Sequence, residues 1–589
     1  MDNSQIAELL RNVAASYIIK NEEKFRFQII AYQRAADSIE GSSVQLLDHY
    51  KEGKLDSIPG IGVSIRGHLE ELFKKGDVKH FERALKGIPE TVFVLMKIPT
   101  FGPKKAYRLV EEFGFTNKAT VTEDLKQIAL NGKIAPLRGF GEKSEKDILR
   151  AINEFKEGRG KTTRMILPFA SEIADKILSY LRKNPKIEAA YTLGSLRRMA
   201  PTVGDIDIAV ASENPAEAID HFISYPYMER VIEKGDITSS ILVSGGRQVD
   251  LMVQSPQAFG SLLQHFTGSK NHNIALREFA LKKGLSLSEY GIKNLKDRKS
   301  KLNQYESEED FYRTLGLQWI PPEIRENGGE IELAKKNKLP KLVELKDARG
   351  DLHLHSNFPI EPSHDLGKDS LGNMVDKALS LGYQYIGFSE HNPSISKHTK
   401  KEIIDLIEKR NKAIEHILSG KKSIRVFKLL EVDILPNGTL AVDEKALNLL
   451  DFAIVSVHSV FHMGKEDMTK RVLLGLSHPK AKILAHPTGR ILNQRTGYEL
   501  DWGKVFNFCK ENNKALEINA WPTRLDLPDS IIRQAVEARV RMIINTDSHA
   551  VNQMDNMKYG VAMARRGWAK KSDILNTLDY NKFTKWMKL

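Results

Sequence analysis

The distribution of apolar and polar residues predicts three kinds of structure along the chain. Between residues 189 and 253, short segments alternate apolar and polar positions, and this period of two indicates β-strands. Beyond residue 351, apolar runs of strand length alternate with helical segments, which is typical of α/β architecture. Before residue 160, helical runs are predicted at 64–73, 104–113 and 143–155, and each follows a glycine-containing turn.

Chain length and punctuation predict several domains. At roughly 150 residues per domain, a chain of 589 residues suggests about four domains. Pro321-Pro322 ends one unit, a polar stretch follows at 325–330, and the lysine-rich segment 335–346 has the character of a linker or its flanking helix. The chain is therefore treated as two halves that meet near residue 340.

The glycine turns before residue 150 form a repeat. Each unit places an apolar residue, any residue, Gly or Thr, a second apolar residue and Gly before a helix with basic residues. Glycine permits tight turns, and the backbone N–H groups of the following helix start can hold a phosphate oxygen. The units resemble helix-hairpin-helix motifs, which bind the nucleic-acid backbone, although ordinary hairpins in a helical bundle are the alternative. The expected DNA-binding positions are Gly60, Gly62, Thr100, Gly102, Gly139 and Gly141.

Three carboxylates on predicted strands form a candidate catalytic site. A period of two places Asp205 and Asp207 on one face of a strand, and Asp250 lies on a later strand. Such carboxylates can bind two Mg²⁺ or Mn²⁺ ions roughly 3.5–4 Å apart, which activate a hydroxyl group and stabilise a leaving phosphate. Upstream, Gly194-Ser195 opens a helix that can hold phosphates, and Arg198 adds positive charge.

This set resembles the nucleotidyltransferase signature of family X DNA polymerases, the group that includes DNA polymerase beta. The resemblance implies that Asp205 and Asp207 bind both metals and that Asp250 binds the one that activates the primer 3′-hydroxyl. It continues into a thumb, and a helical lyase-like domain would precede the palm. In that domain His68 stands where some relatives carry a Schiff-base lysine, and because imidazole cannot form the same Schiff base, the sequence leaves the lyase activity open. The resemblance implies nucleotide-binding roles for Gly194, Ser195, Arg198, His265, Phe266, Gly268 and Asn273, and a DNA contact for Arg277.

The C-terminal half is rich in metal-ligand residues. Of the 17 histidines, six fall before residue 351 and eleven after it, although the second segment is shorter. Six predicted strands end in His, Asp or Glu, and parallel strands of a closed α/β barrel bring such ends together. Mixed His and carboxylate ligands without cysteine suit Mn²⁺, Zn²⁺ or Fe²⁺.

The ordered set of ligands resembles the polymerase and histidinol phosphatase (PHP) domain. The resemblance implies a distorted (β/α)7 barrel with up to three metal ions and a 3′–5′ exonuclease, with 3′-phosphatase or abasic-site endonuclease as alternatives. The segment before Asp365 is long, so His364 is an alternative to Asp365, and Glu390 stands where aspartate is commoner. Glu517 could be either a site residue or a buried hydrogen-bonding residue. The implied ligands are His353, His355, Asp365, His391, Glu431, His458, His486, Asp547 and His549.

Together the resemblances predict an order of domains. The fold class expected is multidomain, with a helical helix-hairpin-helix N-terminal region, an α+β nucleotidyltransferase palm with its thumb, and a C-terminal barrel. The expected boundaries are 1–90 for the lyase-like domain, 91–160 for the fingers, 161–260 for the palm, 261–325 for the thumb, 326–347 for a linker and 348–589 for the PHP domain.

Composition agrees with a polyanion as partner. Lys and Arg number 89 and Asp and Glu number 76, which leaves a net charge of +13. One cysteine excludes an internal disulfide, and neither a signal peptide nor an apolar run of membrane-spanning length is present. We expect a monomeric cytoplasmic DNA repair polymerase that acts on gapped or nicked DNA with deoxynucleoside triphosphates. The alternatives are a template-independent or RNA-directed nucleotidyltransferase and a non-catalytic DNA-binding scaffold.

Overall fold

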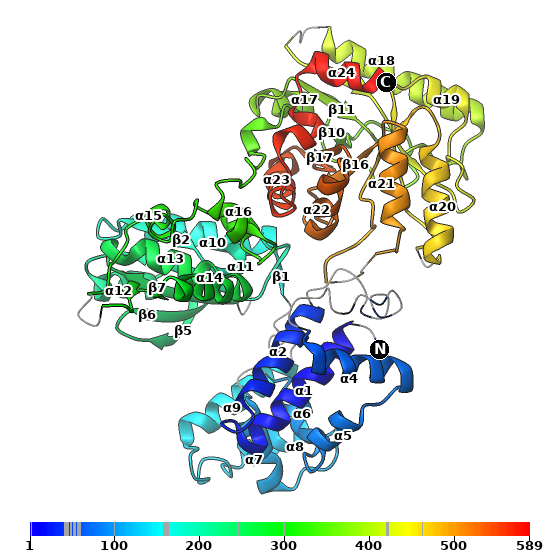
Figure 1. Cartoon of the computed structure of the whole chain (residues 1–589). Coiled ribbons are helices and arrows are strands. Elements are labelled where there is room, and N and C mark those ends of the chain that lie inside the picture. The colour runs from blue at the N-terminus through cyan, green and yellow to red at the C-terminus, as the bar shows by residue number, and fades with distance from the viewer. Residues whose placement is uncertain are drawn as a thin grey trace. The chain divides into compact units, whose positions relative to one another are not determined.

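The computed structural model divides the chain into two compact units, 1–163 and 164–589 (Figure 1). It describes all residues except 2, 41–45, 47–49, 51–52, 54, 56–60, 99–100, 157–163, 244–246, 298–300, 420–422, 462, 494, 496 and 589. Among the described helices, none combines the length and apolar character needed to cross a lipid bilayer.

The first unit is helical and contains two cores. Leu10, Tyr32 and Leu69 belong to the core shared by α1, α2, α4 and α5, whereas Leu109 and Ile148 belong to the core shared by α6 to α9. The predicted helices after the glycine turns are α4, α7 and α9. The helices are α1 Asn3–Asn21, α2 Arg26–Glu40, α4 Val63–Lys75, α5 Lys79–Leu85, α6 Glu90–Leu95, α7 Pro103–Phe113, α8 Val121–Leu130 and α9 Glu142–Lys156.

The second unit begins with a five-stranded sheet in the order β2-β4-β7-β6-β5, in which only β4 and β7 are parallel neighbours. Ile206, Ile208 and Val210 of β4 are buried in the core that also contains residues of α10 and α12. Ala209 packs with α13 on the other face. The elements are β1 Met165–Ile166, α10 Leu167–Leu181, β2 Ala189–Thr192, α11 Gly194–Arg197, β3 Thr202–Val203, β4 Ile206–Ala211, α12 Pro215–Ile223, β5 Met228–Lys234, β6 Thr238–Val243 and β7 Arg247–Gln254.

A smaller helical segment with a β-hairpin follows this sheet. Its core includes Phe311 and Tyr312, and it also takes in Trp568 from near the C-terminus. The predicted linker 326–347 contains a helix, α16, whose Ile331 and Ala334 are buried in the same core. The elements are α13 Phe259–Thr267, α14 Lys270–Lys282, β8 Leu285–Ser288, β9 Gly291–Asn294, α15 Glu308–Thr314 and α16 Glu330–Lys335.

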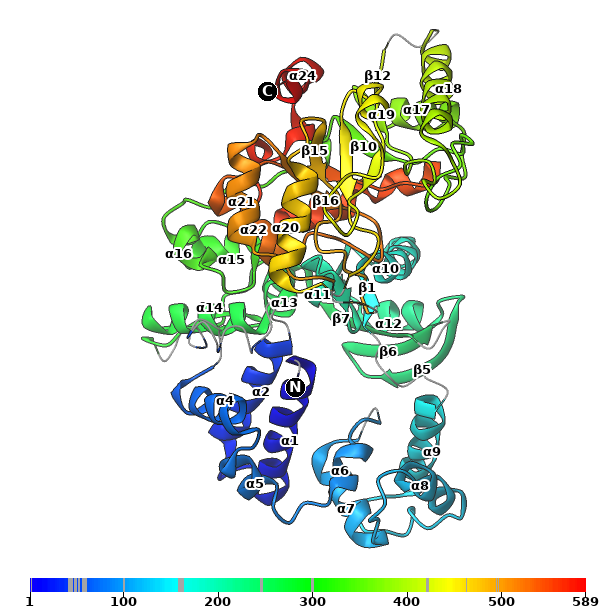
Figure 2. The ribbon, with the colours of Figure 1, turned by 90° about the vertical axis from the view of Figure 1, so that its right-hand side faces the viewer.

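The remaining chain alternates strands and helices, as the sequence predicts. Its strands form parallel sheets in the orders β10-β11-β12 and β13-β14-β15-β16-β17, and α20, α21 and α22 lie along their outer side (Figures 1 and 2). Ile454 and Ile483 pack with Phe583 and Trp586 of α24, whereas the alternate residue Val455 belongs to a second core.

The sheets of this C-terminal region (350–589) are linked by isolated parallel bridges, Leu354 with Ser548 and His391 with Glu431. The strands are β10 Gly350–Leu354, β11 Tyr385–Phe388, β12 Arg425–Lys428, β13 Glu431–Asp433, β14 Ala453–Ser456, β15 Ala481–Leu484, β16 Ala515–Asn519 and β17 Met542–Asn545. The helices are α17 Leu371–Ser380, α18 Lys400–Leu418, α19 Glu444–Asn448, α20 Lys465–Leu476, α21 Trp502–Glu511, α22 Asp529–Ala538, α23 Met557–Arg566 and α24 Tyr580–Lys588.

Candidate catalytic sites

The three predicted palm carboxylates lie together on the central sheet. Asp207 on β4 and Asp250 on β7 are direct partners in the parallel register, and Asp205 immediately precedes β4. The neighbours Ile206 and Ile208 point into the core, which leaves the carboxylates on the accessible face. The structure therefore brings together the residues that the alternating pattern selects.

Burial and mutual repulsion raise the pKa of two of these carboxylates. Burial, and then the charge of Asp250, raises the pKa of Asp205, and burial with Asp250 and Asp205 raises the pKa of Asp207 to about 6. Ser240 and Gln248 donate hydrogen bonds to Asp250, with Gln248 Nε2 2.9 Å from Oδ1. A divalent cation relieves repulsion of this kind, so the donor set fits a hard metal ion.

Gly194 lies directly against this carboxylate pair. Its φ is +56°, and a Cβ at this position would lie 2.9 Å from Oδ2 of Asp207. Glycine is therefore required both by the backbone conformation and by the close approach of the carboxylate. Ser195 follows it in the short helix α11.

The two arginines after this turn have different surroundings. Both terminal nitrogens of Arg197 bind Glu308, at 3.0 and 2.6 Å, and Arg325 contacts the same carboxylate at 2.6 Å. Arg198 instead donates from Nε to Glu326 at 3.0 Å and from Nη1 to the carbonyl of Thr267 at 2.6 Å. Arg197 thus ties α11 to α15, whereas Arg198 lies beside the turn at Gly268, where a Cβ would come within 2.9 Å of its Nη1.

The predicted nucleotide contacts of the thumb and the predicted DNA contact Arg277 lie together on α13 and α14. Asn273 donates to the carbonyl of His265 at 2.6 Å and accepts from Gln264 at 3.0 Å. Nη2 of Arg277 lies 3.4 Å from the His265 ring, whose centroid lies 4.7 Å from that of Phe266. Burial is the main cause that lowers the pKa of His265, so the ring is neutral at physiological pH.

The helix-hairpin-helix glycines are open to ligands. Gly62 and Gly102 are the N-caps of α4 and α7, and Gly141 immediately precedes α9. Among the residues that the structure describes, no atom lies within 4 Å of a Cβ placed on any of these three glycines, so their backbone can approach a phosphate. Gly139 has φ +84°, as expected of a tight turn, but Gly62 and Gly102 do not have positive φ. Gly60 and Thr100 lie outside the described residues.

His68, which the resemblance aligns with a lysine of some relatives, stacks on His80 with ring centroids 4.3 Å apart. Its Nδ1 lies 2.9 Å from the hydroxyl of Tyr32. Burial, with a smaller contribution from His80, lowers the pKa of His68. This position therefore offers a neutral imidazole.

A cluster of histidines and carboxylates occupies one end of the strands of the C-terminal region. Glu431, at the start of β13, lies at its centre, with His353, His391, His458 and His486 each having a ring nitrogen 2.8–3.2 Å from its carboxylate. On the other side, Nε2 of His355 lies 3.2 Å from Asp547, and the His355 ring stacks on that of His549 at 4.1 Å. The candidate ligand groups are His355, His391 and His549; His353, His355, Glu431 and Asp547; His391, Glu431 and His458; and His364, Asp433 and His458.

The buried polar atoms of this cluster fit a site that could hold metal ions. Buried polar atoms are nearly always hydrogen-bonded. Within the described part of the chain, however, buried atoms of these side chains make no well-directed hydrogen bond, although three of the nitrogens lie 3.0–3.2 Å from a carboxylate oxygen. The atoms are His353 Nε2, His355 Nδ1 and Nε2, His391 Nδ1, Glu431 Oε2, His486 Nδ1 and His549 Nε2. Burial and neighbouring imidazoles hold the pKa of His355 well below its ordinary value, which leaves a neutral imidazole that can bind a metal ion.

The predicted ligand Asp365 is the exception. It is exposed and belongs to none of the ligand groups found among the described residues, whereas the adjacent His364 lies 3.3 Å from Asp433. The geometry therefore favours the alternative, His364, over Asp365. Asp433 was not predicted from the sequence, although it lies two positions after Glu431 on β13, and a period of two would have placed both on one face.

Two further carboxylates support the cluster from behind. Glu517 accepts hydrogen bonds from Nδ1 of His353 at 2.7 Å and from the backbone N–H of His486 at 2.8 Å. Glu517 is thus a buried hydrogen-bonding residue, which is one of the two alternatives that the sequence left open for it. Glu390 accepts from Ser356 at 2.5 Å and lies 3.6 Å from Arg410, away from the ligand groups.

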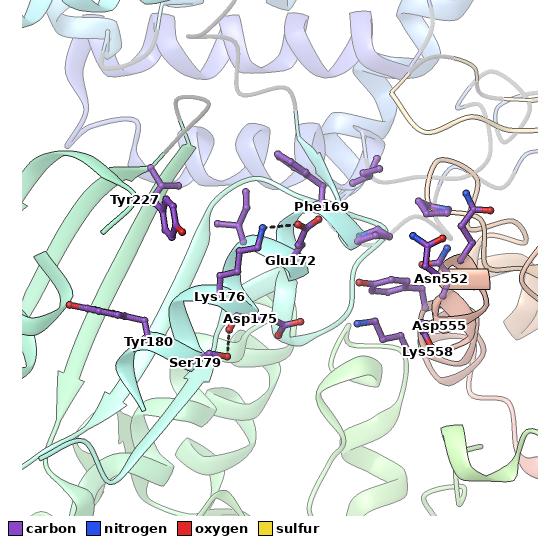
Figure 3. Close-up of a pocket in the computed structure, with 18 of the residues that line it drawn as sticks. Phe169, Glu172, Asp175, Lys176, Ser179, Tyr180, Tyr227, Asn552, Asp555 and Lys558 are labelled. Atoms are coloured by element: carbon purple, nitrogen blue, oxygen red, sulfur yellow. Dashed lines mark hydrogen bonds and ion pairs between the residues drawn. The ribbon is translucent and has the colours of Figure 1, made fainter. Parts of the chain in front are cut away.

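A separate pocket of about 1370 Å³ lies between α10 and residues 552–559 (Figure 3). Its lining residues, all in the described part of the chain, include none of the predicted metal ligands. Lys176 is paired with Glu172 inside the pocket, and Asp555 with Lys377. With its charges balanced in this way, the pocket lacks the positive surface expected of a phosphate-binding groove.

Comparison with known proteins connects both sites to characterised families. Residues 1–78 match a helix-hairpin-helix domain and residues 262–326 match the DNA polymerase beta thumb. The chain is 34% identical over 579 residues to the DNA polymerase/3′-5′ exonuclease PolX of Bacillus subtilis (strain 168), which covers 98% of this chain and 97% of that protein.

Two further relatives match shorter parts of the chain, and one is named as a phosphatase and the other as a DNA polymerase. A protein of Clostridium acetobutylicum named "Probable phosphatase" is 29% identical over 247 residues, 40% of this chain and 93% of its own length. DNA polymerase lambda of Rattus norvegicus is 24% identical over 353 residues, 55% of this chain and 56% of its own length.

Proposed function

Because the chain belongs to the family X DNA polymerases, we propose that it extends DNA primers at the palm and removes nucleotides from 3′ ends at the C-terminal cluster. The observation that supports the first activity best is the pairing of Asp207 with Asp250 on parallel neighbouring strands, with Asp205 beside them.

Each palm residue has a role in this proposal. Asp205 and Asp207 would hold two divalent ions, Mg²⁺ or Mn²⁺, and Asp250 would share the one nearer the primer. When bound, such ions supply a more acidic 3′-hydroxyl and stabilise the charge of the leaving pyrophosphate. Gly194 and Ser195 offer backbone and side-chain donors to the triphosphate, and Arg198 offers a guanidinium group.

The thumb residues would select and align the base pair. The cluster of His265, Phe266 and Asn273 lies beside the turn at Gly268, where the incoming nucleotide would be bound. Arg277, in contact with His265, would reach the template strand. Because histidine replaces the tyrosine of polymerase beta at residue 265, its contact with the sugar is expected to differ.

For the C-terminal region we propose a closed, distorted (β/α)7 barrel of the PHP type. The parallel bridges support it, because Leu354–Ser548 joins the edge strand β10 to the segment after the edge strand β17, and His391–Glu431 joins the segment after β11 to the edge strand β13. Residues 429 and 430 would then interrupt a single strand formed by β12 and β13. Closure would bring all the ligand-bearing strand ends to one rim.

The C-terminal cluster would hold up to three ions of Mn²⁺, Zn²⁺ or Fe²⁺. When bound, such ions would lower the pKa of a water molecule towards neutrality and so would supply a nucleophile for the terminal phosphodiester. The proposed ligands are His353, His355, His391, Glu431, His458, Asp547 and His549. His364 and Asp433 would complete the group that contains His458, and His486 contacts the ligands through Glu431. A 3′-phosphatase activity is the second candidate, because the phosphatase relative aligns with this part of the chain.

The proposed substrates are gapped or nicked DNA and deoxynucleoside triphosphates, used by a monomer in DNA repair. The helix-hairpin-helix glycines would bind backbone phosphates on both sides of the gap. A template-independent nucleotidyltransferase would add nucleotides without regard to the template base, so the identity of the incorporated base separates the two.

Primer extension on a gapped duplex with Mg²⁺ tests the polymerase proposal. The wild-type chain is expected to fill the gap, and Asp207→Ala to lose about 10³-fold or more in rate, because a ligand of both metals is removed. Equal extension by both proteins would refute the assignment. Metal analysis of the purified protein provides the matching test for the C-terminal cluster, since a non-catalytic scaffold would bind no transition metal there.

A further inference from the structure

Arg566, the last residue of α23 in the C-terminal region, contacts the nucleotide-binding arginine of the palm. Its Nη1 donates to the carbonyl oxygen of Arg198 at 2.9 Å and to Oε1 of Glu326 at 3.1 Å. The same Glu326 oxygen accepts a hydrogen bond from Nε of Arg198 at 3.0 Å. One guanidinium therefore holds both the main chain of Arg198 and the carboxylate that orients its side chain.

Arg566 is itself firmly held. Its Nε and Nη2 lie 2.8 and 2.6 Å from the carboxylate of Asp529 on α22, and its side chain is only 8% exposed. Burial opposes the charge on Glu326, but Arg566 and then Arg198 outweigh it and lower the pKa of that carboxyl. Asp529, Arg566, Glu326 and Arg198 thus form a row of alternating charges from the C-terminal region to the palm.

This row fixes Arg198 in one orientation. Two of its nitrogens are occupied, Nε by Glu326 and Nη1 by the carbonyl of Thr267, and no partner of Nη2 is found among the described residues. Two hydrogen bonds determine the plane of a guanidinium and leave the third nitrogen for a further acceptor. Arg197, by contrast, has both terminal nitrogens on Glu308.

We propose that Arg566 is a positioning residue for the incoming nucleotide, acting through Glu326 and Arg198. The proposal rests on the proposed function, in which Arg198 binds the triphosphate. A side chain that is already oriented loses less conformational entropy when the phosphate binds, so its affinity is higher. The C-terminal region then contributes to nucleotide binding at the palm as well as carrying its own metal cluster.

Arg566→Lys isolates this role. Lysine keeps the positive charge beside Asp529, but a single ammonium cannot reproduce the planar fork that reaches Asp529, Glu326 and the Arg198 carbonyl together. Arg565→Lys is the matched control, because Arg565 lies at the same interface but donates to Glu323 at 2.7 Å and to the carbonyl of Val343 at 3.1 Å. Glu326→Gln is a second variant with low folding risk, since Glu326 is 37% exposed.

The measurement is single-turnover incorporation into a one-nucleotide gap, which separates the nucleotide dissociation constant from the maximal rate. We expect Arg566→Lys to raise the dissociation constant about tenfold with a smaller change in rate, Glu326→Gln to raise it in the same direction, and Arg565→Lys to leave it unchanged. In an Arg198→Met background, Arg566→Lys should cause no further rise, because the two act in series. Hydrolysis of a model phosphodiester with Mn²⁺ should be unaffected by Arg566→Lys and reports an intact fold.

Three results would overturn the proposal in distinguishable ways. If Arg198→Met raises the dissociation constant but neither Arg566→Lys nor Glu326→Gln does, Arg198 binds the nucleotide without help from the C-terminal region. An Arg198→Met variant that binds nucleotide normally would overturn both the positioning role and the assignment of Arg198. A further tenfold rise in the dissociation constant when Arg566→Lys is added to Arg198→Met would show that Arg566 does not act through Arg198.

Discussion

Nε2 of His364 lies 3.3 Å from Oδ1 of Asp433, and the same oxygen lies 2.6 Å from Nδ1 of His458. The three side chains come from a loop, from β13 and from the end of β14, so the fold alone brings them together. They extend the central cluster around Glu431 outward, because His458 contacts both carboxylates.

The first prediction concerns two adjacent residues. His364→Ala should lower Mn²⁺-dependent hydrolysis of a 3′-labelled DNA strand by roughly 10- to 100-fold, the range seen when residues around a metal centre are removed. Asp365→Ala should have activity close to wild type, because that side chain is exposed and outside the ligand groups. The reverse order of the two activities would return the metal position to Asp365.

The second prediction concerns Glu517, which orients His353 through Nδ1. Glu517→Gln should weaken metal affinity and phosphoesterase activity by roughly 10- to 100-fold while leaving primer extension intact. Titration with Mn²⁺ followed by the hydrolysis rate measures the change. Glu537→Gln, on the exposed face of α22 and paired with Arg533, serves as the control and should have no effect.

The third prediction is a pH dependence of stability. Burial opposes the charge on Glu308, but Arg325 and Arg197 lower its pKa from 4.5 to about 2. Because the folded-state pKa is depressed, the stabilisation is fully present above the unfolded value and is lost as pH falls from 4.5 towards 2.

Glu308→Gln tests this dependence. It leaves two buried or nearly buried guanidinium groups uncompensated and should cost about 3–5 kcal/mol of unfolding free energy at neutral pH. Thermal unfolding followed across acidic pH should show a smaller decline for the variant than for the wild type. Parallel declines would mean that Glu308 is not the group that titrates.

The fourth prediction concerns the net charge of +13. If the hairpin glycines and basic side chains bind DNA phosphates, affinity for a gapped duplex should fall roughly 10³-fold or more between about 50 and about 200 mM salt. Fluorescence anisotropy of labelled DNA gives the slope. A shallow slope would indicate few phosphate contacts.

The carboxylates of the palm could be predicted because their spacing along each strand is a local property of the sequence. The alternation around Asp205 and Asp207 fixes their common face, and a strand at Asp250 follows from its apolar neighbours. The parallel register that pairs Asp207 with Asp250 is a tertiary feature, with β5 and β6 intervening in the chain. No local pattern specifies which strands become neighbours.

The C-terminal cluster was predictable to the extent that its ligands end strands. The sequence could not decide between Asp365 and His364 because both lie in a loop, where no periodicity indicates which side chain points inward. Asp433 had a usable signal, its spacing of two from Glu431. Arg566 had none, because its contact with Arg198 joins positions 368 residues apart.

The central claim is that one chain carries two independent metal-dependent sites, and reciprocal variants on one substrate test it most directly. On a 3′-labelled primer in a gapped duplex, Asp207→Ala should abolish extension and retain Mn²⁺-dependent shortening, whereas His353→Ala should retain extension and abolish shortening. Loss of both activities in either variant, or shortening that survives His353→Ala, would contradict the account.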